Sequence, residues 1–513
     1  MTVELLPTPI APLPAIRWHE RAEQRERPVA AALRVACLAE RAAERQLERL
    51  FAPRALCVTT GQQPGLFLGP LYAVYKAMSA VALAARLERL LGRPVVPVFW
   101  VAGDDHDHAE ACQTHLLTAA SDVLRLALPE RAPDAPLTPM YRERLGPTVA
   151  DLVGIARRES PPSEFRDDVL GWIGRHYTPE ADVAGAFAGA LAELLGPLGL
   201  VVFRPTHEAA KRAMCPLLLE ALARAGALDR TLAAHAEELV ARGAAAPVAA
   251  GDGATTVMVE GAAGRDRLLL RNGTFQTRRS GQRFTLDELR VLADRAPERF
   301  SPNVLLRPVV EAALLPTLAY VGGPGELAYL PQAAPLYDAL GVPPQAPIAR
   351  WSGMVVEARV RKVLDRYDLQ PSELQPPAGP LERRLVRGDM PESALAALQA
   401  LREAVPREYA RLQEGAVSVD PTLRRPVESA QHVALTGLED IEKRIIAHLK
   451  QQNDILVQQL AKSRRSLYPL DEPQERVLNI VSYLVRYGPP FLATLQDAAA
   501  RWAGALEPRL PGA

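Results

Sequence analysis

The chain has 513 residues, too many for one ordinary hydrophobic core, so we expect two or three structural units. Hydrophobic residues make up 48% and charged residues 23%, which is typical of a folded globular protein and excludes a disordered one. Lys and Arg together number 60, and so do Asp and Glu, so no overall positive field exists to hold nucleic acid or an acidic membrane surface.

No segment is typical of export or membrane anchoring. The start of the sequence, up to Pro28, lacks a basic stretch followed by an apolar run, and about 18 uncharged apolar residues never occur in succession. We therefore expect a cytoplasmic protein without a membrane partner. The four cysteines form no CxxC pair, which predicts neither a disulfide framework nor a zinc ribbon. Cys57 lies in an apolar run and is expected to pack in the core rather than act as a nucleophile.

The predicted elements begin with a helical region over residues 20–50, which is rich in Ala, Arg, Glu and Leu and contains only Pro28 as a breaker. A buried strand over 55–59, a helix over 70–91 and a second buried strand over 95–101 follow. Strand, helix and strand in about fifty residues make a βαβ crossover with parallel strands. The sequence therefore predicts the opening of a doubly wound α/β sheet.

Later segments repeat this pattern. Residues 182–195 are helical in pattern, 198–203 form a buried strand, and 314–321 form another apolar run that ends in glycines. Three short β-type stretches between 257 and 277, separated by glycines, predict a small antiparallel insertion. Inserted between strands of the main sheet, it would form a lid or a pocket wall.

The composition changes at about residue 381, where long stretches rich in Ala, Leu, Glu, Arg and Gln begin. A break at 421–426 divides them into two helices, and apolar residues in the second recur in three- and four-residue steps with charges between them. This pattern predicts an antiparallel helical hairpin of the coiled-coil type. The tail over 473–495 is apolar enough to pack back on the core.

Polar motifs in the loops that follow strands are the strongest candidates for a binding site, because ligands of open parallel sheets bind outside the carboxyl ends of the strands. The first loop is TTGQQPG, residues 59–65. Its glycines allow close backbone approach, and the Gln62 and Gln63 amides can both donate and accept hydrogen bonds. Gly69 and Pro70 then open a helix whose free N–H groups favour an anionic ligand. Spacing alone leaves open whether the glutamines bind a ligand or only cap the sheet.

The second loop, GDDHDH at 103–108, leaves the next parallel strand at the same sheet edge. Its carboxylates and imidazoles can serve as a general base, as Mg²⁺ ligands or as a clamp for an ammonium group. Because alternate residues of an extended loop diverge, Asp105 with Asp107, or His106 with one Asp, should converge. These three are the candidate catalytic residues. We predict no transition-metal site, since a second segment usually adds ligands, and an exposed charged loop is the alternative.

A third loop, GGPGE at 322–326, again ends a strand and opens a helix, which suits a phosphate or carboxylate on backbone amides. It is neither GxGxxG nor a P-loop, so no dinucleotide site is predicted. Upstream, Asn303 and Arg307 flank a short apolar stretch, and the forked guanidinium suits a carboxylate-rich substrate. The basic residues at 211–212 and 462–465 are expected on solvated faces.

Four blocks together resemble the cysteine ligase family of bacillithiol biosynthesis, in that family's order. They are TGQQPGLFLGPLYAVYKAMS, PVVPVFWVAGDDHDHAE, FSPNVLLRPVVEAALLPTLAYVGGPGELAYL and SLYPLDEPQERVLNIVSYLVRYGPPF, and they span the chain from about residue 55 to the end. The motif residues expected to bind substrate or nucleotide are Thr60, Gly61, Gln62, Gln63, Gly65, Gly69, Tyr72, Lys76, Asn303, Arg307, Gly322, Gly323, Gly325 and Glu326.

The resemblance implies a Rossmann-like core over residues 1–365 with connecting-peptide insertions at about 125–180 and 205–300. It also implies a coiled-coil hairpin over 366–465, through which the chain forms a homodimer, and a segment over 466–513 that packs back on the core.

In function, the resemblance implies the last step of bacillithiol biosynthesis, in which cysteine is joined to glucosaminyl malate. Amide formation is uphill in water, so ATP or another nucleotide, with Mg²⁺, is expected to activate the carboxylate. Clear HIGH and KMSKS signatures are absent, which leaves the nucleotide mechanism open.

By hypothesis, Gln62, Gln63 and the helix start at Gly69 orient an anionic group, the GDDHDH loop holds or deprotonates the amine, and Arg307 binds the malate carboxylates. The rivals are an ATP-dependent ligase with another acceptor and a non-catalytic dimeric ligand-binding or scaffold protein. A tRNA-binding role is weakly supported, because the hairpin mixes both signs of charge.

Overall fold

The computed structural model describes residues 3–9, 16–387 and 390–506. The chain divides into two compact units. Leu5–Val355, with the segment that begins at Gln474, forms the first, and Val356–Pro473 forms the second. The predicted boundaries at 365 and 466 therefore differ from these by several residues. Within the described ranges, no helix is both long and apolar enough to cross a bilayer.

A six-stranded sheet forms the core of the first unit, in the order β14-β13-β3-β4-β7-β2. The strands are β14 (Ala346–Ala349), β13 (Thr317–Gly322), β3 (Leu56–Gln62), β4 (Val95–Val101), β7 (Val201–Phe203) and β2 (Cys37–Leu38). Neighbours from β14 to β7 are parallel, whereas β2 runs antiparallel to β7. Because β4 is wholly buried, its unbroken apolar run suits a strand covered on both faces. The predicted Rossmann-like parallel sheet is confirmed.

The order of the strands places a topological switch point between β3 and β13. From β3 the chain passes through α3 to β4 and later to β7 on one side, while β13 and β14 lie on the other side. Ligands of such sheets bind at the carboxyl ends of the strands where the order reverses. The helices around these strands are α2 (Ala42–Leu50), α3 (Leu71–Leu91), α7 (Val183–Leu195), α11 (Arg307–Leu314), α12 (Pro324–Tyr329) and α13 (Ala334–Ala339).

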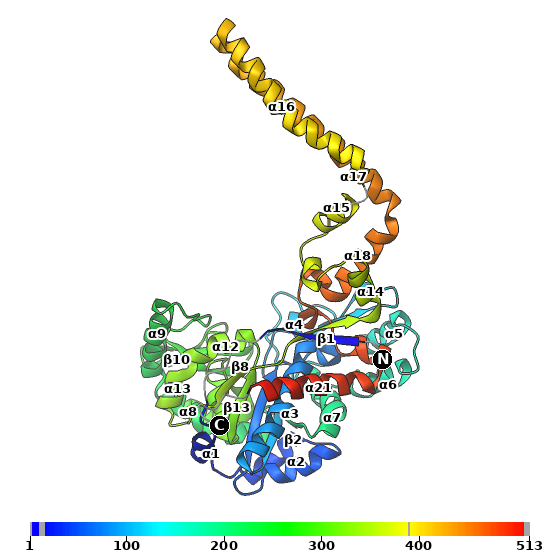
Figure 1. Cartoon of the computed structure of the whole chain (residues 1–513). Helices are drawn as coiled ribbons and strands as arrows, with labels where there is room; N and C mark the ends of the chain where they lie inside the picture. The colour runs from blue at the N-terminus through cyan, green and yellow to red at the C-terminus, as the bar shows by residue number, and fades with distance from the viewer. Residues whose placement is uncertain (1–2, 10–15, 388–389, 507–513) are drawn as a thin grey trace, which may run out of the picture. The chain divides into compact units, whose positions relative to one another are not determined.

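The last helices return to the first unit. They are α19 (Gln474–Val477), α20 (Val481–Tyr487) and α21 (Pro489–Ala505). Helix α21, red in Figure 1, packs alongside α3. Its apolar face is buried through residues such as Phe491 and Leu495. The apolar tail therefore packs back on the first unit through α3.

The prediction of a helical region over residues 20–50 is only partly right. Helix α1 (Trp18–Gln24) ends before Pro28, and β2 follows a 3₁₀ helix over Ala31–Ala36. In β2, Cys37 pairs with Phe203 as an edge strand of the sheet. Pairing with β7 here outweighs the helix propensity of an Ala- and Arg-rich sequence.

Two insertions surround the loop after β4. The elements of the first are α4 (His108–Ala111), β5 (Gln113–Leu117), β6 (Val123–Ala127), α5 (Thr148–Glu159) and α6 (Arg166–His176). Those of the second are α8 (Glu208–Ala223), α9 (Ala225–Ala241), β8 (Ala254–Gly261), β9 (Gly264–Arg271), β10 (Thr274–Thr277), β11 (Arg283–Phe284), α10 (Leu286–Arg295) and β12 (Phe300–Pro302). The antiparallel sheet β11-β10-β9-β8-β12 confirms the predicted antiparallel insertion.

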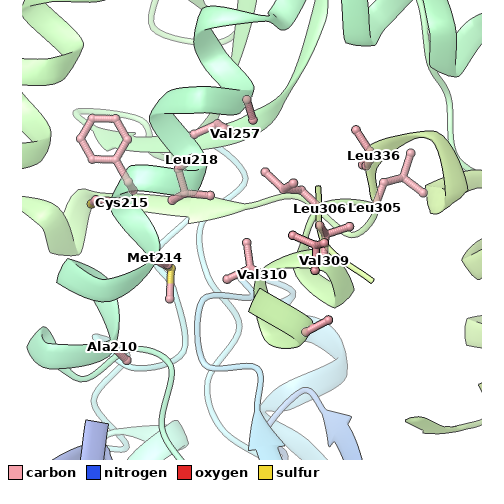
Figure 2. Packing of buried hydrophobic residues seen from close by; sticks show 14 of the residues in the cluster. Ala210, Met214, Cys215, Leu218, Val257, Leu305, Leu306, Val309, Val310 and Leu336 are labelled. Carbon is pink, nitrogen blue, oxygen red and sulfur yellow. The ribbon is translucent and has the colours of Figure 1, made fainter. Parts of the chain in front are cut away.

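Apolar packing fixes the second insertion on the core. In Figure 2, Met214 and Leu218 of α8 lie opposite Val309 and Val310 of α11, with Val257 of β8 nearby. All five side chains are almost fully buried. This apolar packing holds the inserted sheet against the core of the first unit.

The second unit contains the helical hairpin. Its elements are α14 (Ala358–Arg366), α15 (Pro380–Arg387), α16 (Glu392–Val419), α17 (Arg424–Gln452) and α18 (Asp454–Leu467). Helices α16 and α17 lie side by side and are joined at Pro421–Leu423, as predicted (Figure 1). The expectation of a solvated face at 462–465 is wrong for Arg464, which is buried and pairs with Glu382 at 2.9 Å. A further two-stranded sheet joins β1 (Val3–Pro7) and β15 (Gly353–Glu357).

Cys57 is fully buried in β3, where burial raises the pKa of its thiol to about 12. A thiol with so high a pKa is a poor nucleophile near neutral pH. The prediction of a packing role is confirmed.

Candidate functional site

Lys76 joins the two loops at the switch point. From α3 its ammonium donates to the Gly61 carbonyl and to Oε1 of Gln62, each at 2.8 Å, and pairs with the Glu326 carboxylate. The side chain is only 3% exposed, and burial lowers the pKa of Lys76 although Glu326 opposes that effect. We call Gly61, Gln62, Lys76, Gly323 and Glu326 the switch-point cluster.

Glu326 closes the other side of this cluster. Its carboxylate accepts the Gly323 N–H at 2.8 Å, the Tyr320 hydroxyl and the Lys76 ammonium. Burial alone would raise the pKa of Glu326, but Lys76 and these hydrogen bonds hold it below its ordinary value. The expectation that the GGPGE loop offers free amides to an anion is therefore wrong for Gly323, whose N–H is already bound.

Arg307 and Asn303 have different roles. One arm of the Arg307 guanidinium donates to Glu311 at 2.9 Å, and the group lies over the Tyr320 ring with its carbon 5.0 Å from the centroid. Its Nη2 is buried without a hydrogen-bond partner among the described residues. Asn303 instead accepts the N–H groups of Leu305 and Leu306 and shapes the start of α11. Nη2 is therefore the unpartnered end of a guanidinium that also interacts with Tyr329, while the Asn303 carbonyl oxygen accepts backbone N–H groups.

Arg350, which follows β14, is a site residue that no sequence motif revealed. It makes two bonds to the Glu475 carboxylate, at 2.9 and 2.5 Å, and lies 5.8 Å from the centre of the Tyr72 ring. Its Nε is buried and lacks a partner among the described residues. A Cβ at Gly323 would lie 3.7 Å from this Nε and 3.8 Å from Cε of Lys76. The glycine therefore keeps space open between two cationic side chains.

Further hydrogen bonds connect the first loop to the second. Gln62 Nε2 donates to the Tyr72 hydroxyl at 3.3 Å, and that hydroxyl donates to Glu110 at 3.2 Å. Gln63 Nε2 donates to the Asp107 carbonyl at 2.8 Å. The structure thus brings the glutamine loop and the GDDHDH loop together, as their position at one sheet edge predicts.

Within the GDDHDH loop the aspartates organise the backbone. Asp105 Oδ1 accepts the N–H groups of His106 at 2.6 Å and Asp107 at 3.3 Å. Asp107 Oδ1 accepts the Glu110 N–H at 3.0 Å and so caps α4. One oxygen of each carboxylate is therefore used in folding the loop.

His106 lies between the two insertions. Its Nδ1 is 3.3 Å from Nη1 of Arg265 on β9, and its carbonyl accepts Nη1 of Arg131 at 3.4 Å. Burial, followed by the charge of Arg265, lowers the pKa of His106. Because a guanidinium only donates, the Nδ1 lone pair is already in use. His106 cannot accept a substrate proton at Nδ1 in this geometry.

Lys211 is not on a solvated face, contrary to expectation. Its side chain is fully buried and pairs with Asp104 at 2.5 Å, and it donates to the Phe300 carbonyl at 2.7 Å. This ammonium links α8 and β12 of the second insertion to the start of the GDDHDH loop. The charge was missed because α8 is covered on the face that carries Lys211, which a helical pattern alone does not show.

The remaining predicted residues shape the fold. Thr60 donates to the Val321 carbonyl at 2.8 Å, within the sheet. Gly65 and Gly69 lie so close that a Cβ on Gly65 would be 2.9 Å from the Gly69 Cα. The first N–H of α3, on Leu71, is bound by the Leu478 carbonyl at 2.8 Å, so this helix start is not free for an anion as expected.

The other two glycines of the GGPGE loop, Gly322 and Gly325, lie on either side of Gly323 in the sequence. The Gly322 carbonyl accepts the Arg350 N–H at 2.9 Å, and nothing lies within 4 Å of a Cβ built on Gly325.

No three His, Cys, Asp or Glu side chains in the described part of the chain are grouped to hold a metal ion.

Comparison with known proteins gives two family matches. The N-terminal Rossmann-like domain of bacillithiol biosynthesis BshC matches residues 17–349, and the C-terminal coiled-coil domain of BshC matches residues 353–504. A protein of Salinibacter ruber named "Putative cysteine ligase BshC" is 33% identical over 453 residues, which cover 88% of this chain and 82% of that protein. Proteins of the same name from Heliobacterium modesticaldum and Koribacter versatilis are 33% and 32% identical, covering 89% and 87% of this chain and 83% and 82% of their own.

The Lys211 pair makes a direct prediction for stability. Lys211→Met leaves the Asp104 charge without its buried partner and should lower the free energy of unfolding by about 3–5 kcal/mol. Adding Asp104→Asn should restore part of this loss. Denaturant unfolding followed by circular dichroism measures both.

The matched control is the neighbouring Arg212→Met, because the Arg212 side chain is 56% exposed and pairs with Glu208 on the same helix. It should cost less than about 1 kcal/mol. Equal losses for the two variants would show that the Lys211 pair is not a buried ion pair in solution.

Proposed function

The chain belongs to the BshC family of bacillithiol biosynthesis, and from this premise we propose that it is the ligase that joins cysteine to glucosaminyl malate. The observation that carries the proposal is the adjacency of two kinds of group at one sheet edge. Among the residues that the structure describes, Arg307 and Arg350 each keep a buried, unpartnered N–H beside the switch-point cluster. Asp107 and Glu110 lie one loop away, tied to that cluster through Gln63 and Tyr72.

Amide formation defines what the site must supply. The carboxyl carbon of cysteine gains a bond to the sugar nitrogen, the amine loses a proton, and the carboxyl oxygen leaves on its activating group. The amine must attack as the free base, so a proton acceptor has to lie near it. Because cysteine and nucleotides are made in the cytoplasm, we place the protein there.

The two guanidinium groups are suited to a carboxylate. We assign Nε of Arg350 and Nη2 of Arg307 to the carboxylates of the malate moiety, since a charge-assisted hydrogen bond would satisfy a donor that otherwise stays unpaired. Lys76 and Glu326 neutralise each other and keep the loops after β3 and β13 in register. Their role is to fix the geometry in which the substrates meet.

The carboxylates of Asp107 and Glu110 are assigned to the amine. Glu110 is exposed as a residue, but protein atoms around the carboxyl itself raise its pKa. A carboxylate with a raised pKa accepts a proton more readily, and the Tyr72 hydroxyl orients it. Glu110 was missed as a candidate because it lies just past the GDDHDH motif.

A nucleotide, with Mg²⁺, remains the proposed source of activation. Its phosphates would need several free cations or backbone N–H groups, but Lys76 is paired with Glu326, the Gly323 N–H is bound by Glu326, and Arg307 and Arg350 each keep only the single N–H assigned to malate. The switch-point residues therefore do not fit a triphosphate. We derive no step through the nucleotide and assign it no residues.

Purified protein tests the function when it is incubated with cysteine, glucosaminyl malate and each nucleoside triphosphate in turn. Mass spectrometry should detect bacillithiol with one of them, and the accompanying phosphate or pyrophosphate identifies the activation chemistry. Lys76→Met should lower the rate by roughly 100-fold, because the two loops lose their common partner. Arg89→Gln, on the exposed end of the same helix, should leave the rate unchanged.

Formation of a different amide from another acceptor would support the rival ligase. Specific binding of glucosaminyl malate without any product would support the scaffold role instead.

We also propose a homodimer formed through the hairpin. Several apolar side chains of α16 and α17 are exposed, among them Leu412 at 56%, Val433 at 67% and Ile441 at 52%. Apolar side chains at this density on a charged hairpin favour burial against a second copy.

The double variant Leu412→Glu/Val433→Glu should separate the copies. Analytical ultracentrifugation should give twice the chain mass of 55.7 kDa for the native protein and a single chain mass for the variant. Ser429→Glu, which also adds a charge on α17, should remain dimeric. A native protein that sediments as one chain would rule out the proposed dimer.

A further inference from the structure

Arg265 holds His106 from the inserted sheet. Its three nitrogens each have a partner: Nε donates to the Ser301 hydroxyl at 2.9 Å, Nη2 donates to the Pro302 carbonyl at 2.7 Å, and Nη1 lies 3.3 Å from His106 Nδ1. Two of these partners belong to β12, which pairs with β8, and β8 pairs with β9. The hydrogen bonds to β12 therefore hold the guanidinium in place independently of its contact with the imidazole.

The direction of this hydrogen bond is settled by chemistry. A guanidinium has donors only, so the imidazole must accept at Nδ1. A neutral imidazole that accepts at Nδ1 carries its hydrogen on Nε2. No hydrogen bond to this Nε2 is made by any described residue, so the N–H is available to a ligand.

Several charges act on His106. Burial and the positive charges of Arg265 and Arg131 favour the neutral ring, whereas the carboxylates of Asp105 and Asp107 in its own loop favour the protonated ring. The balance lowers the pKa of His106. Near neutral pH the ring is uncharged and keeps the tautomer that Arg265 selects.

We propose that Arg265 is a positioning residue that fixes His106 as a neutral hydrogen-bond donor through Nε2–H. This inference rests on the proposed ligase function. When the amine attacks the carboxyl carbon of cysteine, the C–N bond forms and the C=O electron pair moves to oxygen. His106 Nε2–H stabilises that oxygen, the amine proton passes to Asp107 or Glu110, and the activating group leaves as the carbonyl re-forms. His106 is thus a donor in the reaction and not its base.

Nitrogen-15 NMR of the histidine rings tests the tautomer independently of activity. In the whole native protein, the His106 signals, identified by their loss in His106→Gln, should show hydrogen on Nε2 and a pKa below the ordinary value of about 6.5. In Arg265→Met, the Nδ1–H tautomer should become populated and the pKa should rise toward the ordinary value. Arg271→Met, at the exposed end of the same strand, should leave both unchanged.

Activity assays test the role of the donor. A glutamine amide can donate but cannot accept a proton as a base, so His106→Gln should retain at least about tenfold more activity than His106→Leu, which should lose roughly 100-fold. Arg265→Met should lower kcat about tenfold and leave KM for cysteine nearly constant, because the donor is misplaced without loss of substrate binding.

Three results would overturn the inference. They are an Nδ1–H tautomer in the native protein, an unchanged tautomer in Arg265→Met, and equal inactivity of His106→Gln and His106→Leu. If the native protein couples no cysteine at all, the proposed ligase function fails. The NMR result still decides whether Arg265 selects the tautomer of the His106 imidazole.

Discussion

The buried ion pair between Lys76 and Glu326 is the interaction on which the site depends. Burying an ammonium is costly unless every one of its donors is satisfied. Here three donors meet three acceptors: the Gly61 carbonyl, the Gln62 amide oxygen and the Glu326 carboxylate. Since two of these acceptors lie at the end of β3 and Glu326 lies in α12, just after β13, a single side chain links the two loops at the switch point.

In the loop after β4, too, cationic side chains link separate segments, and here they come from the insertions. Lys211 holds Asp104, and Arg131 and Arg265 hold the backbone and the ring of His106. All three cations come from segments that leave the parallel sheet and return to it. The insertions thus hold the loop in place, which explains how a short polar segment keeps a defined geometry.

Much of the fold follows from local patterns. The unbroken apolar runs of β3 and β4 and the helical periodicity of α3 are enough to predict a parallel βαβ unit, and the break at 421–426 is enough to predict the hairpin. The short strand β2 could not be predicted, because Cys37–Leu38 becomes a strand only by pairing with β7.

The site follows from the sequence only in part. The loops could be ranked because strand ends share one edge, and the structure brings Gln62, Lys76 and Glu326 together there. Local sequence could not show that Lys211 is buried or that Arg350 and Arg265 reach the site, because their partners lie far along the chain.

The most direct test of this account is to measure low-molecular-weight thiols by mass spectrometry in cells with the protein, in cells without it, and in cells to which it has been restored. The account predicts that bacillithiol disappears without the protein, that glucosaminyl malate accumulates, and that restoring the native chain reverses both changes. An unchanged bacillithiol pool in cells without the protein would contradict the proposed ligase function.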